Sequence, residues 1–402
     1  MKKAIVLGAA MLLAGAAAFA ASDIKFSGSA QAGYSFAFGE DNIYRSWKDW
    51  DGDDGECEFD LAISDADGLW SLSLDDGKFG FGDLQVAAQI KVNLTKAMNK
   101  AGIDTGDFGL SFGIGRKNSE SELTAYGDKS GNHYQRVQAA NGGYLTVIDA
   151  NYSSLVKARV MFSPIDGKDT VATTYTYEEI SGASGTYRLV ETSKPVSGDH
   201  TSFGISAVVT PVDGVKVAAG YTKNGQSRIN SKRNNETYLP GIFKDKLLRD
   251  NWLTGSASVD VAKLIGTSDF KLSLDVADRF AFEQEDVKYN RLSVQVAGGV
   301  DLVDGYAEYS LATKDASDTT NVSQLKVGAS FHVVEGLGLG AYTQFFDLTD
   351  ELADCDAFTV GGDISYGFGN VTYALNLEYG NDTKDNADDH YFAITPSVAI
   401  EF

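Results

Sequence analysis

Histidine and serine are the residues of this chain best suited to acid–base or nucleophilic chemistry, and the sequence holds four histidines: His133, His200, His332 and His390. None of them stands at a metal-ligand spacing from another histidine or from a cysteine. Ser330 and His332 are two residues apart, so on a strand their side chains share one face. A hydrolase would need this serine to be activated by an oriented base. We interpret Ser330 and His332 instead as a polar pair that lines the water-filled side of a strand.

An acidic stretch at 39–56 carries aspartates at alternate positions, Asp49, Asp51 and Asp53. This spacing is similar to the opening of a calcium-binding loop. Asp54 stands where such a loop needs glycine, and Asp60 stands where it needs glutamate. The sequence therefore excludes an EF-hand, and leaves a solvated acidic loop or a weak, loose divalent-cation site as the alternatives.

The composition excludes several classes of function. The 402 residues include 34 Lys+Arg against 56 Asp+Glu, which gives a formal net charge of −22. This charge argues against nucleic acid as a partner, because phosphate binding needs clustered positive charge. Only two cysteines, Cys57 and Cys355, are present, so a disulfide-dense scaffold and a thiolate metal cluster are excluded, while one bridge between them stays open. No cofactor is implied.

The N-terminal segment has the form of an export signal. Lys2 and Lys3 precede an uninterrupted run of apolar and small residues at 4–20, and Ala18-Phe19-Ala20 supplies a cleavage site. We expect residues 1–20 to be a cleaved signal peptide and 21–402 to be the mature domain. A retained membrane helix is the alternative, but the run is short and rich in alanine.

Beyond this segment, apolar and polar residues alternate with a period of two, which is typical of strands with one apolar and one polar face. At 24–38 the apolar positions include Ile24, Phe26 and Phe36, and the polar positions include Lys25 and Ser27. The same period recurs at 84–95, 107–115, 268–283, 323–334 and 371–380.

Short and long connections alternate along the chain. Tight-turn sequences of the Asp-Gly type include Ser163–Gly167 and Thr210–Gly214, which we expect on the same rim. We count about 18 strands, including 155–163, 169–179 and 201–210. Residues 143–149 and 186–192 could add strands, so the range is about 16 to 20.

Two all-β architectures could accommodate such strands. A soluble sandwich would carry many charges on its outer faces, whereas the polar face here is mostly Ser, Gly, Thr and Gln with isolated charges. A closed barrel satisfies every backbone group in lipid while one face meets hydrocarbon and the other meets water. We therefore predict a transmembrane antiparallel β-barrel. A barrel of this width should enclose a water-filled channel.

The final segment, 390–402, alternates apolar residues and ends on an aromatic residue. Here the sequence resembles the Gram-negative-type outer-membrane β-barrel porins. The resemblance implies a location in the cell outer membrane, both termini in the periplasm, outer-membrane lipid and the barrel assembly machinery as partners, and a possible homotrimer. It also implies that the last strand is the assembly signal, through Phe392, Ile394, Val398, Ile400 and Phe402.

If the apolar residues face lipid, charged residues at the other parity point inward and set ion preference. The residues predicted to line the pore are Lys91, Lys157, Arg159, Lys216, Lys271, Asp275, Arg279, Arg291, Glu308 and Lys326. General porins narrow their lumen with the third external loop, and the segment 116–153 takes that place by our count. Its candidate constriction residues are Glu120, Glu122, Asp128 and Arg136. An ordinary surface loop is the alternative.

The sequence thus predicts a porin that passes ions and small hydrophilic solutes by diffusion, and not an enzyme. A barrel that displays long loops as an adhesin or major surface antigen is the second hypothesis. An outer-membrane barrel hydrolase that uses Ser330 is the third.

Overall fold

The structure is a computed structural model, and the residues that it describes are 24–33, 35–39, 43–46, 57–79, 84–115, 121–129, 137, 145–163, 169–170, 174–179, 187–192, 195–196, 201–227, 248–284, 287–315, 320–348, 355–382 and 389–402. The expected signal peptide, 1–20, lies outside these ranges.

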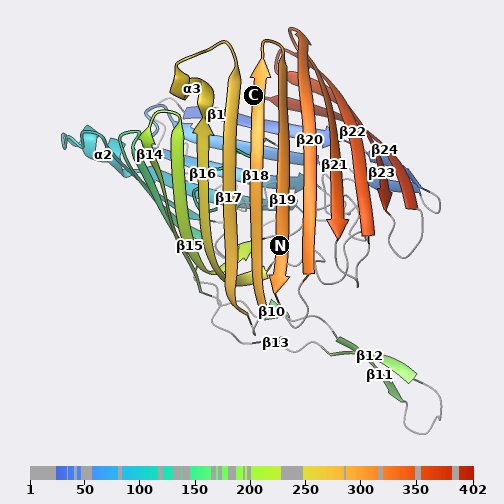
Figure 1. Ribbon diagram of the computed structural model, residues 1–402. Coiled ribbons are helices and arrows are strands. Elements are labelled where there is room, and N and C mark those ends of the chain that lie inside the picture. The colour runs from blue at the N-terminus through green and yellow to red at the C-terminus, as the bar shows by residue number, and fades with distance from the viewer. Residues whose placement is uncertain are drawn as a thin grey trace.

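The described chain forms a closed antiparallel β-barrel of 18 strands, as predicted (Figure 1). Strand β24 pairs with both β23 and β1, so the sheet closes on itself. The first barrel strand consists of β1 (Ile24–Gly33) and its continuation β2 (Ser35–Gly39). The short strand β3 (Ile43–Ser46) pairs with β2. The others are β4 (Cys57–Asp65), β5 (Trp70–Phe79), β6 (Leu84–Asn93), β7 (Phe108–Gly115), β8 (Leu145–Tyr152), β9 (Val156–Ser163), β14 (Ser202–Val212), β15 (Val215–Ser227), β16 (Leu248–Asp260), β17 (Lys271–Gln284), β18 (Val287–Val300), β19 (Val303–Asp315), β20 (Thr320–Val334), β21 (Leu337–Leu348), β22 (Cys355–Phe368), β23 (Val371–Asp382) and β24 (Asp389–Glu401).

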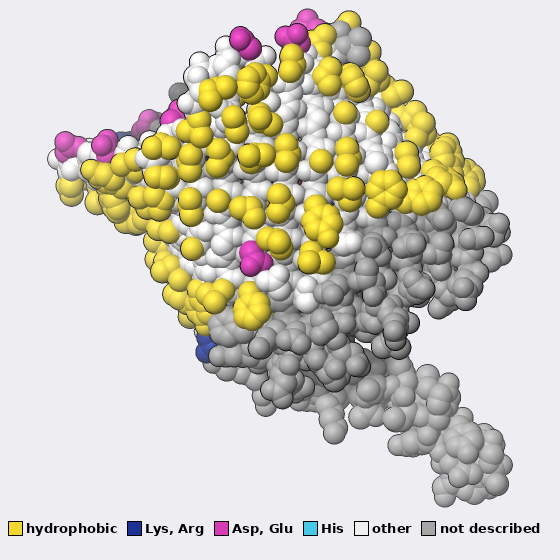
Figure 2. Space-filling view, viewed as in Figure 1, with side chains coloured by type: hydrophobic (Ala, Val, Ile, Leu, Met, Phe, Trp, Pro, Cys, Tyr) yellow, Lys and Arg dark blue, Asp and Glu magenta, His cyan; other side chains and the backbone are white. Residues whose placement is uncertain are grey.

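The strands alternate between an apolar outer face and a polar inner face. On β17, Leu274 and Val276 are exposed on the outside, whereas Asp275 between them is buried inside. Hydrophobic side chains cover much of the described outer surface seen in Figure 2. In a soluble protein so much exposed apolar surface would be unfavourable, whereas hydrocarbon solvates it, so the outer face suits a bilayer.

The two rims of the barrel differ in their connections. On one, which we call the turn rim, hairpins join consecutive strands and glycines such as Gly214 (φ 87°) and Gly336 (φ 82°) take up the left-handed backbone conformation. Glycine has no Cβ and adopts this conformation without steric cost. The other, which we call the loop rim, carries the connection between β7 and β8 and the one between β9 and β14.

Two short helices replace tight turns on the turn rim, α2 (Leu94–Lys100) between β6 and β7 and α3 (Val261–Ile265) between β16 and β17. Each is capped by the last residue of the preceding strand. The Asn93 side chain accepts a hydrogen bond from the Lys96 amide at 2.9 Å, and Asp260 accepts one from the Lys263 amide at 3.0 Å. Within the described residues, no helix is long and apolar enough to cross a membrane.

One predicted barrel strand was wrong, and another segment takes its place. Residues 169–179 contribute β10 (Asp169–Thr170) and β11 (Thr174–Glu179), which pair outside the barrel with β13 (Pro195–Val196) and β12 (Tyr187–Thr192). Strand β8 belongs to the barrel instead. It was hard to recognise because two of its apolar residues, Leu145 and Val147, point inward and pack on Met161, which blurs the alternation.

This exchange also corrects the expected position of one turn. With β8 in place, β9 starts at the turn rim and its last residue, Ser163, lies at the loop rim opposite Ser202. The segment 210–214 lies at the turn rim. Ser163 therefore lies at the opposite rim from 210–214, because one additional strand reverses the direction of the next, while residues 164–167 lie outside the described ranges.

The last strand lies beside the first, and Phe402 completes their pairing. Its amide donates to the Gly28 carbonyl at 2.9 Å, and its carbonyl accepts from the Gly28 amide at 2.7 Å. A Cβ on residue 28 would lie 2.9 Å from the Phe402 ring, so glycine leaves room for the terminal aromatic side chain. The predicted assembly-signal residues Phe392, Ile394, Val398 and Ile400 share its outward parity on β24.

Candidate functional site: the inner face of the barrel

The charged residues predicted to line a lumen occur at the inward-facing parity of their strands. Asp275 on β17, Glu308 on β19 and Lys326 on β20 lie in one row of paired residues, with Gln295 of β18 between the first two. Arg279 and Arg291 lie directly opposite each other on β17 and β18. The barrel therefore groups charges that are far apart in sequence.

Part of the connection between β7 and β8 lies inside the barrel, against the inner faces of several strands. We call Ser121–Lys129 the docked segment. Its backbone amides donate to inward side chains: Leu123 to Ser206 at 2.8 Å, Ala125 to Ser256 at 2.8 Å, Gly127 to Asp275 at 3.1 Å and Lys129 to Gln295 at 2.8 Å. The Gln295 amide nitrogen also donates to the Gly127 carbonyl. The segment thus crosses from β14 to β18.

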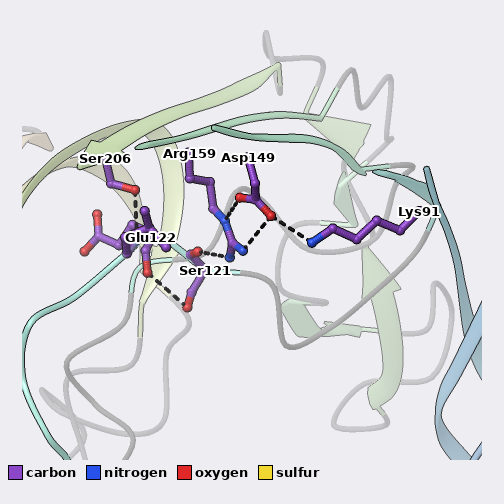
Figure 3. Close-up of polar contacts among 7 residues, drawn as sticks. Lys91, Ser121, Glu122, Asp149, Arg159 and Ser206 are labelled. Atoms are coloured by element: carbon purple, nitrogen blue, oxygen red, sulfur yellow. Dashed lines mark hydrogen bonds and ion pairs between the residues drawn. The ribbon is translucent and has the colours of Figure 1, made fainter. Parts of the chain in front are cut away.

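A cluster of charges holds the start of the docked segment (Figure 3). The Arg159 guanidinium donates to both carboxylate oxygens of Asp149, at 2.6 and 3.1 Å, and Lys91 donates to the same carboxylate at 2.9 Å. Arg159 also donates to the Ser121 carbonyl at 2.9 Å. Bidentate, charge-assisted hydrogen bonds of this kind fix the relative orientation of the two side chains. Strands β6, β8 and β9 thus position Ser121 through one carboxylate.

Several inward charges are shielded from water. Arg279 exposes 1% of its surface, Arg291 and Asp275 expose 3% each, and Glu308 exposes 2%. Arg279 stacks on Trp252, with its guanidinium carbon 5.7 Å from the ring centroid. Burying a charge is costly unless it is compensated by partners. Asp275, Glu308 and Arg279 interact with Gly127, Tyr126 and Glu122 of the docked segment, and so form a polar layer with it. Arg291 donates to Gln324 on β20.

Other inward charges are open to solvent. Lys157, Lys216 and Lys271 are exposed, and each stands near the turn-rim end of its strand. Lys271 donates to Asp304 at 3.0 Å. The inner face therefore has a covered part, contacted by the docked segment, and a solvated part near the turn rim.

Glu122 is the buried acid of the docked segment, and it lies outside the membrane-spanning strands. It exposes 4% of its surface. Burial raises the pKa of Glu122 to about 8, although Thr254 and Arg279 oppose the shift. Asp128 is half-buried, and its neighbour Tyr126 is buried. The candidates Glu120 and Arg136 lie outside the described residues, as do Asp49, Asp51 and Asp53.

The structure adds residues that sequence reasoning missed. Asp149, Ser206, Ser256 and Gln295 hold the docked segment or its start. The alternation predicts the face of Ser206, Ser256 and Gln295 but not this role, and Asp149 lies on β8, the strand that the prediction does not count. A cavity of about 730 Å³ opens on the turn-rim side of the segment. Two tyrosines line it, Tyr306 and Tyr342. Both stand at inward positions of predicted strands, which was the available signal.

The geometry gives little support to hydrolase chemistry. His332 Nε2 lies 3.7 Å from the Asp304 carboxylate, and no hydrogen bond joins Ser330 to His332, both of which the structure describes. Among the described residues, no group of three or more histidine, cysteine or acidic side chains is placed to hold a metal ion.

Comparison with known proteins defines the fold. No protein-family model and no curated protein matches the sequence. Among solved structures, the chain is similar to Pseudomonas aeruginosa OpdQ, with a TM-score of 0.55 and 10% identity over 94% of this chain and 98% of that one. It is also similar to P. aeruginosa OccK3 (OpdO), with a TM-score of 0.56 and 9% identity over 94% and 96% of the two chains. P. aeruginosa OccK2 (OpdF) in complex with glucuronate gives a TM-score of 0.53 and 10% identity over 94% and 98%. At these identities the likeness concerns the fold, which is that of an outer-membrane porin barrel.

Proposed function

We propose that the chain is an outer-membrane porin that passes ions and small hydrophilic solutes by diffusion. The observation that carries the proposal is the combination of a closed barrel, apolar outside and polar inside, with a loop segment docked across its inner face. A barrel of 18 strands is too wide to be filled by its own wall side chains, so a water-filled path fits it best. Its working does not require a reaction or a cofactor.

In this proposal the docked segment narrows the path and the inward charges set the ion preference. Lys157, Lys216 and Lys271 meet the solvent directly, and Lys91 and Lys326 meet it in part. Arg279, Asp275 and Glu308 act at shorter range through the docked segment that they support.

The setting of the channel follows from the same proposal. Residues 1–20 act as a signal peptide, the turn rim and both mature termini face the periplasm, and the docked loop enters from the external side. The belt of exposed apolar side chains meets outer-membrane lipid. The last strand, ending in Phe402, is recognised by the barrel assembly machinery, and the mature chain forms a homotrimer.

The test is a single-channel recording. The refolded mature chain is inserted into a planar bilayer, and its current and reversal potential are measured in a salt gradient. Stable conductance steps support a porin, and the sign of the reversal potential reports whether cations or anions are preferred. A folded barrel that never conducts would overturn the proposal.

Display of a surface feature is a second candidate function. Strands β11 and β12 form a hairpin that stands clear of the barrel beyond the loop rim (Figure 1). Such an element suits contact with another surface. Deleting 171–194 should abolish adhesion to host cells without changing conductance if display is a function, and should leave adhesion unchanged if it is not.

A further inference from the structure

The cavity on the turn-rim side of the docked segment has features that solute diffusion alone does not require. It is lined by the inner faces of β17 to β22, by the connection after α3, and by Lys129 at the end of the docked segment. Its volume of about 730 Å³ lies within the usual range of small-molecule sites. A permeating molecule would pass it directly before or after the docked segment.

Two tyrosine rings lie flat against this part of the wall. In one row of paired residues, Tyr306 of β19 is followed by Gly328, Tyr342 and Gly361 on the next three strands. A Cβ on residue 328 would come within 2.6 Å of the Tyr306 ring, and a Cβ on residue 361 would overlap the Tyr342 ring. The glycines therefore let each ring rest on its neighbouring strand. The two rings lie two strand spacings apart, roughly 10 Å.

The position of Tyr342 is fixed by its neighbours. Its hydroxyl donates to the Glu378 carboxylate on β23, two strands away. The Lys326 ammonium lies 5.3 Å from the centre of its ring. A side chain fixed in this way loses little further freedom on binding, so it is a preorganised contact.

The charges around the cavity are balanced. Its ionisable lining residues include three lysines and three aspartates, Lys129, Lys263, Lys271, Asp260, Asp304 and Asp363. Asp304 is paired with Lys271, and Asp260 caps α3. A site with no excess charge favours a neutral ligand over an ion. Asp363 and Ser330 also line the cavity, and their oxygens can accept hydrogen bonds from ligand hydroxyls.

We propose that this cavity is a binding subsite for a neutral sugar. The apolar face of a pyranose ring would pack on Tyr306 or Tyr342, and its hydroxyls would bond to Asp363, Ser330 and nearby polar groups. Two rings on one row suit a disaccharide better than a monosaccharide. The inference rests on the proposed porin function and names a substrate class for it.

The experiment measures block of the single-channel current by maltose. Mannitol has hydroxyls but no ring face, and glucuronate has the ring but carries a charge, so both serve as comparison ligands. We expect maltose to block in a concentration-dependent way, and the other two to need at least about tenfold higher concentrations. Equal block by mannitol, or block by glucuronate without block by maltose, would overturn the proposal.

The tyrosines are tested with variants of similar size. Tyr306→Leu and Tyr342→Leu should each raise the half-blocking maltose concentration about three- to tenfold, because a stacked ring contact is lost. Tyr306→Phe should keep most of the block. Tyr309→Leu is the matched control, because Tyr309 is on the same strand and faces outward. Unchanged block in both cavity variants would contradict the proposal.

A second measurement separates this proposal from the porin function itself. Maltose binding to the folded barrel in detergent is followed by saturation-transfer NMR, which needs no current. If the barrel does not conduct but binds maltose with the same dependence on Tyr306, the subsite stands and the porin proposal falls. If it conducts and no maltose signal is seen, the subsite falls alone.

Discussion

Two regions of the inner face carry inward charges, and the charges of the two regions differ in their exposure to water. Under the docked segment, Arg279 and Asp275 expose 1% and 3% of their surfaces. Near the turn rim, Lys157 and Lys216 point inward at the same parity and are exposed. Strand periodicity gives the face on which a charge lies, whereas its contact with water depends on what covers that face. The covered charges are therefore parts of a packed layer, whereas in the proposed porin the exposed ones would act on ions directly.

The largest expected effect concerns the covered region, where burial of Glu122 should make the stability of the barrel depend on pH. The unfolded chain titrates Glu122 near its ordinary pKa of 4.5, whereas burial raises the folded value to about 8. Between these values the unfolded state has released a proton that the folded state keeps, so stability falls as pH rises through that window. Removing this titration with Glu122→Gln should therefore stabilise the barrel at pH 8 relative to pH 4, by up to about 4 kcal/mol.

The measurement is denaturant unfolding of the folded barrel in detergent at several pH values. Glu335→Gln is the control, because Glu335 is exposed on the turn between β20 and β21. If the free energy of unfolding depends on pH in the same way in the wild type and in Glu122→Gln, then burial does not raise the pKa of Glu122.

Removing a covered cation is the next test. Arg279→Met deletes the charge that stacks on Trp252 within the buried layer. We expect a loss of about 2 kcal/mol in the free energy of unfolding, because a desolvated cation–π contact and the electrostatic interaction with buried Glu122 are lost. The same unfolding experiment measures it. A change below about 0.5 kcal/mol would place Arg279 with the solvated charges instead.

The attachment of the docked segment can be broken more selectively. Gln295→Leu removes the acceptor for the Lys129 amide and the donor to the Gly127 carbonyl. About 1 to 2 kcal/mol of local stability should be lost, because two backbone groups are left without this partner. Open-channel current noise should rise as the segment moves. Gln344→Leu on β21 is the control, since no hydrogen bond between Gln344 and the docked segment is found among the described residues. Equal noise in both variants would contradict the attachment.

Much of the fold could be predicted from the sequence, because lipid outside and water inside impose a period of two on every spanning strand. The predicted total of 18 strands is confirmed, although the prediction counts 169–179 as a barrel strand and the structure has Leu145–Tyr152 in its place. Strand β8 has Leu145 and Val147 on its inner face, where they pack on Met161. The alternation of apolar and polar residues therefore fails where inward-facing side chains pack on one another.

The candidate site was predictable only in part, for the same reason. Parity gave the inward position of Asp275 and Arg279, but their burial depends on the path of the docked segment. That path is set by hydrogen bonds from backbone amides to Ser206, Ser256 and Gln295 on distant strands. Serine and glutamine are common on wet strand faces, so nothing local marks these three as attachment points.

The smallest expected change in stability, and the sharpest contrast with Arg279, belongs to Lys216. Lys216→Met removes an exposed inward charge near the turn rim, so the free energy of unfolding should change by less than about 0.5 kcal/mol. The reversal potential in a salt gradient should nevertheless shift toward cation preference, because a solvated positive charge has left the path. Salt should reduce this shift, since exposed charges are screened at high ionic strength. A destabilised barrel with an unchanged reversal potential would reverse the assignment of covered and exposed charges.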